Sequence, residues 1–384
     1  MRENFKMIAK TFYGFENILA EELLALGAQK IIKGNRSVSF YGDKGFLYKS
    51  NLSLRTALKI LKPICKFRFK DITEYYNNIY SFKWEDHIDI KGSFLINSVV
   101  FHSNVFNNSK FTSLKAKDAI VDRFRDKFNK RPNVISFNPD IRLEIHIDKN
   151  LCTISLDSSG ESLHKRGYKK YNSAAPLNEV LAAGIVLMSK WDKKSDLLDP
   201  MCGTGTFLIE AAMIAKNIAP NLNRFSFAFE KWKDWDVKLF EIIEESVRNK
   251  EVEFEYKLYG FDISNAMVKK AEKNIKVSKI NIDIEFIKKD FLTSKKLDED
   301  KLHILINPPY DKRISADVNE LYKKIGDTLK NNYLYSDVWI ITANLEAIKS
   351  IGLRSNKRIK LFNSNLESRL LNYPIYPGTK KNRS

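Results

Sequence analysis

One stretch near the middle of this 384-residue chain constrains the fold more than any other. It consists of a short apolar strand at 196–198 (DLL), a turn at 199–206 (DPMCGTGT) and a helical apolar pattern at 207–215 (FLIEAAMIA). A strand, a glycine turn and a helix in succession form the first unit of a doubly wound sheet, which binds ligands at the carboxyl ends of its strands. The sequence therefore predicts an α/β fold here, with a ligand site at the glycine turn.

The glycine turn does not match the phosphate-binding motifs. It lacks Gly-Lys-Ser/Thr, and Leu208 stands where a dinucleotide fingerprint has its third glycine. Glycines let a ligand approach the backbone closely, an acid in the turn can pair with an ammonium group, and the following helix N-terminus can meet a carboxylate. S-adenosylmethionine carries both groups. We expect it to contact Asp199, Pro200, Cys202, Gly203, Thr204, Gly205 and Thr206.

Two later strand ends carry acids. The run 256–262 ends in Asp262, followed by Ile263, and the run 284–291 ends in Asp290 and Phe291. Asp262 is placed to accept hydrogen bonds from ribose hydroxyls and Asp290 from an adenine amino group, with Phe291 packed on the ring. Each acid alone is better explained as a helix cap or a solvated turn. In this order, and at strand ends, they predict a nucleoside site. The expected cofactor contacts here are Asp262, Ile263, Asp290 and Phe291.

The segment 304–310 (ILINPPY) joins an apolar strand to two prolines, which fix the backbone in an extended turn. The Asn307 amide oxygen and the Pro308 carbonyl can accept hydrogen bonds from a planar amino group, while Tyr310 stacks on its ring. An ordinary tight turn is the alternative for such a motif in isolation. With the nucleoside site, the motif predicts methylation of an exocyclic amine on an unpaired or flipped base. The candidate catalytic residues are Asn307, Pro308, Pro309 and Tyr310.

These motifs together resemble the class I S-adenosylmethionine-dependent methyltransferases that modify exocyclic amines. The resemblance is closer to the THUMP-domain RNA methyltransferases, in particular the bacterial type that methylates guanine N2 in 23S rRNA, and it covers essentially the whole chain. Its further landmarks are 14–16 (GFE), 19–23 (LAEEL), 156–168 (LDSSGESLHKRGY) and 175–179 (APLNE). The last resembles the segment that closes over the methionine part of the cofactor, which implies cofactor contacts for Pro176 and Leu177. Asn307 is implied to contact the cofactor as well.

The order of expected strands and helices, taken with the resemblance, predicts three units. Residues 1–62 alternate short strands and helices in the manner of a ferredoxin-like unit. Residues 63–160 correspond to the THUMP domain of the family, an RNA-binding α+β unit. Residues 161–384 correspond to a Rossmann-like class I methyltransferase domain. The expected fold class is therefore α/β, with the methyltransferase domain preceded by ferredoxin-like and THUMP units.

The net charge of +18 favours a polyanionic partner, although a lysine-rich proteome is an alternative source of this charge. A basic helix at 113–127 suggests contacts with a nucleic-acid backbone. The alternative is a solvated helix face, because Asp118, Asp122 and Asp126 can pair with its cations. The candidate RNA-binding residues are Lys115, Arg123, Lys127, Lys165, Arg166 and Arg313.

Three widely spaced cysteines (Cys65, Cys152 and Cys202) form neither a metal-binding spacing nor a disulfide framework, which is typical of a reduced, intracellular protein. No stretch has the length of a membrane span, and residues 1–6 carry no apolar signal region. We therefore expect a cytoplasmic protein that uses no metal and no membrane, with ribosomal RNA as partner. Nothing in the sequence indicates an oligomeric state.

Several activities remain open beside methylation of guanine N2 in 23S rRNA. The same motifs would serve a guanine N2 methyltransferase acting on tRNA, or an adenine N6 methyltransferase acting on DNA or RNA. The compact front half favours RNA, because no long target-recognition domain for DNA fits there. A catalytically silent RNA-binding assembly factor is the alternative from another class. The acids at the strand ends, both turn glycines and Asn307 are intact, which speaks against it.

Overall fold

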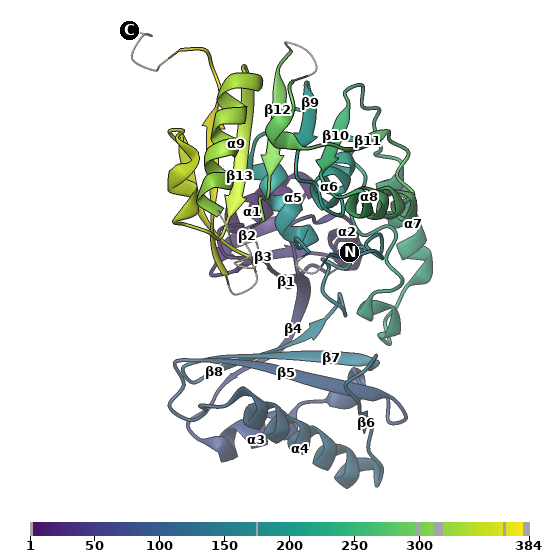
Figure 1. Cartoon of the computed structure of the whole chain (residues 1–384). Helices are drawn as coiled ribbons and strands as arrows, with labels where there is room; N and C mark the ends of the chain where they lie inside the picture. Colours follow the sequence, from purple (N-terminus) through teal and green to yellow (C-terminus); the bar gives the residue numbers. More distant parts are fainter. Residues whose placement is uncertain (1–2, 174–175, 297–299, 310–317, 364–365, 379–384) are drawn as a thin grey trace.

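The computed structural model describes residues 3–173, 176–296, 300–309, 318–363 and 366–378. They form an N-terminal half and a C-terminal half, each built around one β-sheet (Figure 1). The mixed α/β architecture expected from the sequence is confirmed.

The N-terminal half begins with β1 (Phe5–Lys10), α1 (Glu16–Leu26), β2 (Gln29–Gly34), β3 (Ser37–Gly42) and α2 (Lys44–Ser53). It continues with β4 (Lys59–Arg68), α3 (Ile72–Ser81), β5 (Ser93–Phe101), α4 (Ser109–Phe128), β6 (Asn133–Val134), β7 (Ile141–Asp148) and β8 (Leu151–Asp157). Asp71 and Asn108 start α3 and α4, because each side chain accepts hydrogen bonds from the first backbone N–H groups of its helix. Alternate residues of β7 are buried, so this strand has one core face and one open face.

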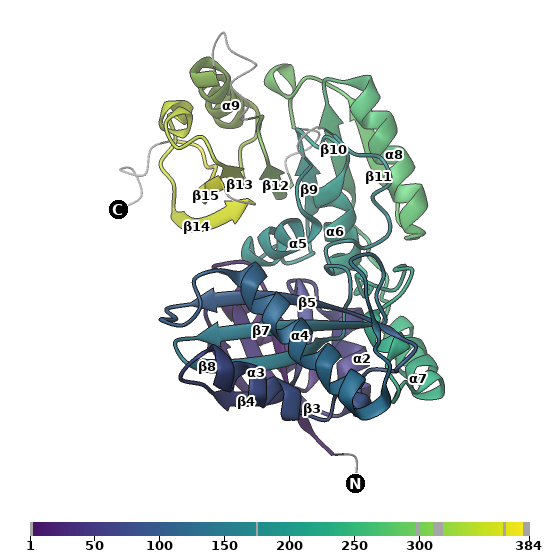
Figure 2. The same ribbon diagram turned by 90° about the horizontal axis from the view of Figure 1, so that it is seen from below.

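All eight strands belong to one sheet, in the order β2-β3-β1-β4-β8-β7-β5-β6. Strand β4 pairs with β1 on one side and with β8 on the other, so it joins the first and second units. The predicted boundary between residues 62 and 63 therefore lies inside β4. Helices α3 and α4 cover one face of the strands β5, β7 and β8 (Figure 2).

The C-terminal half contains α5 (Glu179–Met188), β9 (Asp196–Asp199), α6 (Thr206–Ala215), α7 (Val237–Arg248), β10 (Leu258–Asp262), α8 (Asn265–Ser278), β11 (Ile284–Lys288), β12 (Leu302–Ile306), α9 (Val318–Asn332), β13 (Ser336–Thr342), β14 (Lys357–Asn363) and β15 (Leu366–Pro374). The strand order is β11-β10-β9-β12-β13-β15-β14, and the first five are parallel. Helices α5 and α6 pack on one face and α9 on the other. The chain reverses direction across the sheet at β9, which is the switch point where such sheets bind ligands.

The two halves exchange apolar side chains. Phe229 and Trp232 belong to the C-terminal half in sequence but pack in the core of the N-terminal sheet. Phe15, from the N-terminal half, is buried in the core of the C-terminal sheet. Its ring lies against α5 at Gly184, where a Cβ atom would come within 2.1 Å of it. The two halves therefore share a packed interface and are not joined by a linker alone.

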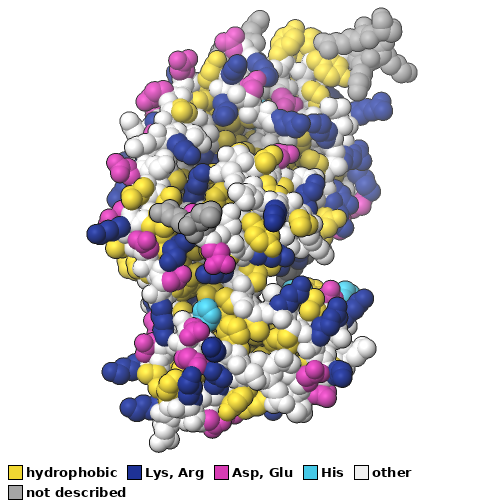
Figure 3. All heavy atoms as spheres, turned by 180° about the vertical axis from the view of Figure 1, so that it is seen from behind, with side chains coloured by type: hydrophobic (Ala, Val, Ile, Leu, Met, Phe, Trp, Pro, Cys, Tyr) yellow, Lys and Arg dark blue, Asp and Glu magenta, His cyan; other side chains and the backbone are white. Residues whose placement is uncertain are grey.

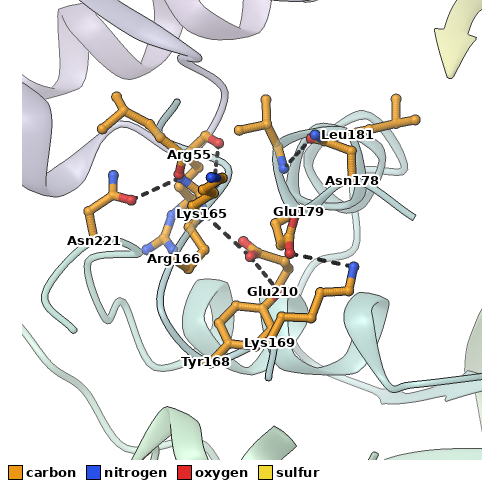
Figure 4. A network of polar contacts seen from close by, with 12 residues as sticks. Arg55, Lys165, Arg166, Tyr168, Lys169, Asn178, Glu179, Leu181, Glu210 and Asn221 are labelled. Atoms are coloured by element: carbon orange, nitrogen blue, oxygen red, sulfur yellow. Dashed lines mark hydrogen bonds and ion pairs between the residues drawn. The ribbon is translucent and has the colours of Figure 1, made fainter. Parts of the chain in front are cut away.

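A buried polar network lies at the junction of the halves (Figure 4). The Arg166 guanidinium donates to the carbonyl oxygens of Leu163 and Arg55 and to Asn221 Oδ1, and its Nε lies 3.5 Å from Glu210 Oε1. The side chains of Arg166 and Glu210 are both 0% exposed. Burial raises the pKa of Glu210, while Arg166 acts in the opposite direction. The network holds α6 against the segment after α2.

We expect Glu210→Ala to lower the free energy of unfolding by about 3–5 kcal/mol, because it leaves a buried guanidinium without its carboxylate. Chemical denaturation of both proteins measures the loss. The matched control is Glu161→Ala, which removes an exposed partner of Lys165 and should cost less than about 1 kcal/mol. Equal, small losses in the two variants would show that the buried pair does not stabilise the junction.

Candidate active site

The carboxyl ends of β10, β9 and β12 lie side by side. Residue pairing aligns Gly260 of β10 with Asp199 and Ile304 of β12 with Leu198, so the turns after these strands share one edge of the sheet. In Figure 1 the arrowheads of β12 and β13 point from this sheet toward the N-terminal half. The sequence-predicted turns therefore meet on the side of the catalytic sheet that faces the N-terminal sheet.

The glycine turn is held by backbone hydrogen bonds to β10. The N–H of Cys202 donates to the carbonyl oxygen of Phe261 (2.9 Å), and the N–H of Gly203 donates to Asp262 Oδ2 (3.0 Å). Gly203 and Gly205 have φ angles of +53° and +81°. A Cβ atom on Gly203 would meet no described atom within 4 Å, whereas one on Gly205 would press on Phe286. Gly203 therefore leaves open space above the turn, and Gly205 lets α6 pack closely.

Asp262 closes the turn and keeps acceptor capacity for a ligand. Besides its bond to the glycine turn, Oδ1 of Asp262 accepts from the N–H of Ser264 (2.8 Å). A carboxylate has about four lone-pair sites, so these two bonds leave acceptors available for hydroxyl groups. The neighbouring Ile263 is 70% exposed, which leaves an aliphatic surface beside the acid.

Asp199 is an unusual acid, because it is only 2% exposed. Its Oδ1 accepts from the N–H of Met201 (3.2 Å), and no described cation forms an ion pair with it. Burial raises the pKa of Asp199 to about 8, and the charge of nearby Asp262 adds to the increase. The free protein therefore holds a protonated acid here, in a position where a positively charged ligand would favour its ionised form.

The third acid is placed as predicted, but its aromatic neighbour is not. Asp290 follows β11 and accepts from the N–H of Leu292 (2.9 Å), which starts a short 3-10 helix. The prediction that Phe291 packs on the ligand ring is wrong: Phe291 is 2% exposed and lies 5.3 Å from the Tyr333 ring in the core. The exposed apolar side chain at this edge is Ile263, which the sequence also places among the cofactor contacts.

Asn307, Pro308 and Pro309 follow β12, and Tyr310 lies outside the described residues. Pro308 is buried and Pro309 exposed. The amide oxygen of Asn307 is buried and accepts no hydrogen bond from any described residue. A buried acceptor without a donor is unfavourable, which makes this atom a candidate for binding a donor group from a ligand.

The segment before α5 is anchored by a lysine that sequence reasoning missed. Lys169 Nζ donates to the carbonyl oxygen of Leu177 and lies 3.4 Å from Glu179 Oε1. Its side chain is 9% exposed, and burial lowers its pKa. Asn178 caps α5. Leu177 is buried, whereas Pro176 is exposed.

The structure corrects two predicted RNA contacts. Arg166 is 1% exposed within the junction network, so it cannot reach a nucleic acid. Arg123 binds the carboxylate of Glu85 through Nε (2.9 Å) and a terminal nitrogen (2.7 Å), and Lys127 pairs with the same acid. These two bonds of Arg123 hold α4 to the segment after α3. The hydrogen bond from Arg123, aided by Lys127, also holds the pKa of Glu85 well below its usual range.

The remaining predicted RNA contacts, which are Lys115, Lys127, Lys165 and Arg313, stay predictions. Lys115 is partly exposed and lies over the Phe111 ring, with its Nζ 5.8 Å from the ring centroid. Lys165 is exposed and pairs with Glu161. Arg313 lies outside the described residues. Within the described part of the chain, no group of His, Cys, Asp and Glu side chains is arranged to hold a metal ion. None of the described helices has the length and apolar character that crossing a membrane requires.

Comparison with protein families matches three consecutive parts of the chain. Residues 166–372 match the RMKL-like methyltransferase domain, residues 69–157 the THUMP domain and residues 6–61 the RlmL ferredoxin-like domain. The chain belongs to the RMKL-like methyltransferase family. The resemblance to THUMP-domain methyltransferases found in the sequence is thereby confirmed.

Relatives of this RMKL-like methyltransferase include proteins of two lengths. The ribosomal RNA large subunit methyltransferase K/L of Syntrophotalea carbinolica is 34% identical over 382 residues, which are 96% of this chain and 53% of that protein. A Synechocystis protein named as an RNA methyltransferase is 33% identical and covers 98% of this chain and 97% of its own length. The chain thus spans about half the length of the K/L relatives and nearly all of the second.

A solved methyltransferase structure in complex with S-adenosylhomocysteine has a TM-score of 0.87 and 28% identity, covering 99% of this chain and all of that chain. The cofactor of the RMKL-like family member described here is S-adenosylmethionine. The site fits it, because two strand-end carboxylates, the open space above Gly203 and the unpaired oxygen of Asn307 lie at one edge of the sheet. The cofactor supplies an electrophilic methyl group on a sulfonium.

We expect the affinity for S-adenosylmethionine to rise more steeply from pH 6 to pH 8 than it does in a variant without an ionisable group at position 199. Asp199, with its raised pKa, is protonated below about pH 8 and must ionise to pair with a cation, so binding releases a proton. Calorimetric titration in two buffers of different ionisation enthalpy measures this release.

Asp199→Asn is the control, since it keeps the shape of the side chain and cannot ionise. The cofactor's own amino group titrates near this range, and comparing the two proteins removes that contribution. If both proteins show the same pH profile and proton release, Asp199 does not pair with the cofactor.

Proposed function

We propose that this protein transfers a methyl group from S-adenosylmethionine to the exocyclic N2 amine of a guanine in 23S rRNA. The observation that carries the proposal is the buried amide oxygen of Asn307, which no described donor satisfies. It lies at the carboxyl end of β12, next in the sheet to the strand that carries Asp199. An amino group on a base provides the missing donor.

Asn307 makes a poor nucleophile more reactive. The lone pair of an exocyclic amine is delocalised into the ring, and two acceptors that bind its hydrogens increase the electron density on nitrogen. The Asn307 amide oxygen and the Pro308 carbonyl oxygen are the proposed acceptors. Nitrogen forms the new bond to carbon as the carbon–sulfur bond breaks, the sulfonium becomes a neutral thioether, and the amine then loses one proton to solvent.

Positioning contributes as much as activation. The nitrogen must lie about 3 to 3.5 Å from the methyl carbon and in line with the bond that breaks. A base in a duplex cannot reach this geometry, so the target guanine is unpaired or flipped, with Tyr310 proposed to stack on it. The carboxylates of Asp262 and Asp290 hold the nucleoside part of the cofactor, with Ile263 against its ring. Asp199 and the turn hold its amino-acid part, and Leu177 and Pro176 lie along it.

The choice of 23S rRNA rests on two supports. Relatives that align with nearly the whole chain are named as large-subunit rRNA methyltransferases. The N-terminal half contains the THUMP domain, and the net charge of +18 of the whole chain favours a nucleic acid as its partner. Transfer RNA as the substrate, and adenine N6 as the target atom, remain outcomes of the test below.

The test is the product. Incubation of the protein with labelled S-adenosylmethionine and protein-free 23S rRNA should yield N2-methylguanosine, identified by mass spectrometry after digestion to nucleosides. N6-methyladenosine would replace guanine with adenine as the target. Transfer to tRNA alone would exclude the rRNA assignment, and the absence of any labelled nucleoside would favour a catalytically silent factor.

We expect Asn307→Ala to lower turnover by about 100-fold or more with little change in cofactor affinity, because its acceptor acts mainly in the transition state. Single-turnover rates measure the chemical step, and calorimetry measures cofactor binding. Asn307→Asp keeps an acceptor at the same place and should retain more activity than the alanine variant. Near-normal turnover in Asn307→Ala would exclude amine activation by this side chain.

A further inference from the structure

The sheet of the N-terminal half has one face that no described helix covers. Helices α3 and α4 lie against one side of β5, β7 and β8, as the views from the front and from below both show (Figures 1 and 2). The opposite side carries the exposed residues of the alternating strands, such as His146 in β7 and Val99 in β5. We call this side, across β4, β8, β7 and β5, the open face.

Pairing between strands arranges the open face in two rows. One row runs across the four strands as Lys66, Thr153, His146 and Val99. The next row is formed, in the same strand order, by Arg68, Leu151, Asp148 and Phe101. Each row therefore has a cation at one end and a large apolar side chain at the other.

The apolar end is unusually exposed for a β-sheet. Val99 is 46% and Phe101 47% exposed, and the Phe101 ring lies 5.5 Å from the ring of His146. Burial and the charge of Lys10 lower the pKa of His146, so this ring is neutral near pH 7. Two adjacent uncharged rings on an open sheet provide a surface on which bases can stack.

The cationic end is free of acidic partners. Among the described residues, neither Lys66 nor Arg68 takes part in an ion pair, and Arg68 donates to the neutral side chain of Asn150 (2.8 Å). The cations of α4 differ, because Lys117, Arg123, Arg125 and Lys127 each pair with an acid. Among the described residues, Lys110 and Lys115 are the cations of α4 that form no ion pair, so the open face and one part of this helix both carry unpaired cations.

The open face looks toward the active site. The labelled strands β5, β7 and β8 lie below the C-terminal half in Figure 1, with their helices on the far side, and the strands β12 and β13 point toward them. The space-filling view shows a notch between the two halves, with Lys, Arg and His side chains along its lower rim (Figure 3). A single strand of nucleic acid lying in this notch would have one end at the open face and the other end near the turn after β12.

We propose that the open face binds an unpaired strand of the substrate RNA, with bases on Phe101 and His146 and phosphates on Lys66 and Arg68. This inference deepens the proposed function and rests on it for the identity of the RNA. Base stacking tolerates any sequence, and phosphate contacts carry no sequence information. The open face therefore holds the RNA strand, while the active site selects the base.

The test measures equilibrium binding of protein-free 23S rRNA fragments, without turnover, over a series of salt concentrations. Lys66→Ala/Arg68→Ala should weaken binding about tenfold and reduce the log-log salt slope by about 1.4, since each phosphate contact to a single strand contributes about 0.7. Phe101→Ala should also weaken binding about tenfold while leaving the salt slope unchanged. Affinity for S-adenosylmethionine should stay the same in all variants, which also shows that they fold.

Two controls on α4 match these changes in kind. Lys117→Ala/Arg125→Ala removes two cations from the same unit, and Phe111→Ala removes an aromatic ring that is 41% exposed. Both should bind RNA as the unchanged protein does. Equal weakening by the α4 variants, or no weakening by the open-face variants, overturns the proposal, as does a protein that binds no RNA.

The outcomes separate this proposal from the proposed function. If the open-face variants bind RNA normally and still form N2-methylguanosine, the proposed function is supported and the open face is not an RNA-binding surface. If the open-face variants weaken RNA binding but the unchanged protein forms another methylated nucleoside, the open face is supported and the proposed target atom is wrong. The open-face variants could also bind protein-free RNA normally and lose activity only on a ribosomal precursor particle. That result would assign the open face to a protein partner and overturn the proposal.

Discussion

The buried contact between Arg166 and Glu210 is the interaction on which the arrangement of the two halves depends. A guanidinium removed from water must have its donors satisfied, and here they reach carbonyl oxygens and an amide on both sides of the junction. Glu210 lies in α6, the helix whose first residue ends the glycine turn. The same charge that joins the halves therefore fixes the helix that begins at the cofactor site.

The acids of the site fix the surrounding backbone and are already oriented for the ligand. Asp262 fixes Gly203 with one oxygen and the start of the next helix with the other, so its position is set before any cofactor arrives. Asp199 lies beside it, and burial, together with the charge of Asp262, raises its pKa. A site whose groups are already oriented loses little entropy when it binds its ligand.

The local parts of the site could be predicted from the sequence, and the long-range parts could not. The glycine turn and the strand-end acids are recognised because each depends on a few consecutive residues. The predicted contact between Phe291 and the cofactor ring is wrong. A residue that follows a capping acid can point into the core, and the packing of the core shows that Phe291 does so. Arg166 was assigned to the surface because it is a cation, and its buried partner Glu210 lies 44 residues later. The predicted boundary at 62/63 falls inside β4, whose two neighbours in the sheet, β1 and β8, are distant from each other in sequence.

Strand β4 has a mechanical consequence. It pairs with β1 of the first unit at residues 59–61 and with β8 of the THUMP unit at residues 61–68, so the two units share one strand and are not joined by a flexible linker. The first unit is in turn fixed to the catalytic sheet through Phe15. The distance from the far strands to the turn after β12 is thus constrained by the shared strand and by this buried ring. If RNA binds as proposed, this distance sets the spacing that the RNA must have between the part held on the open face and the target base.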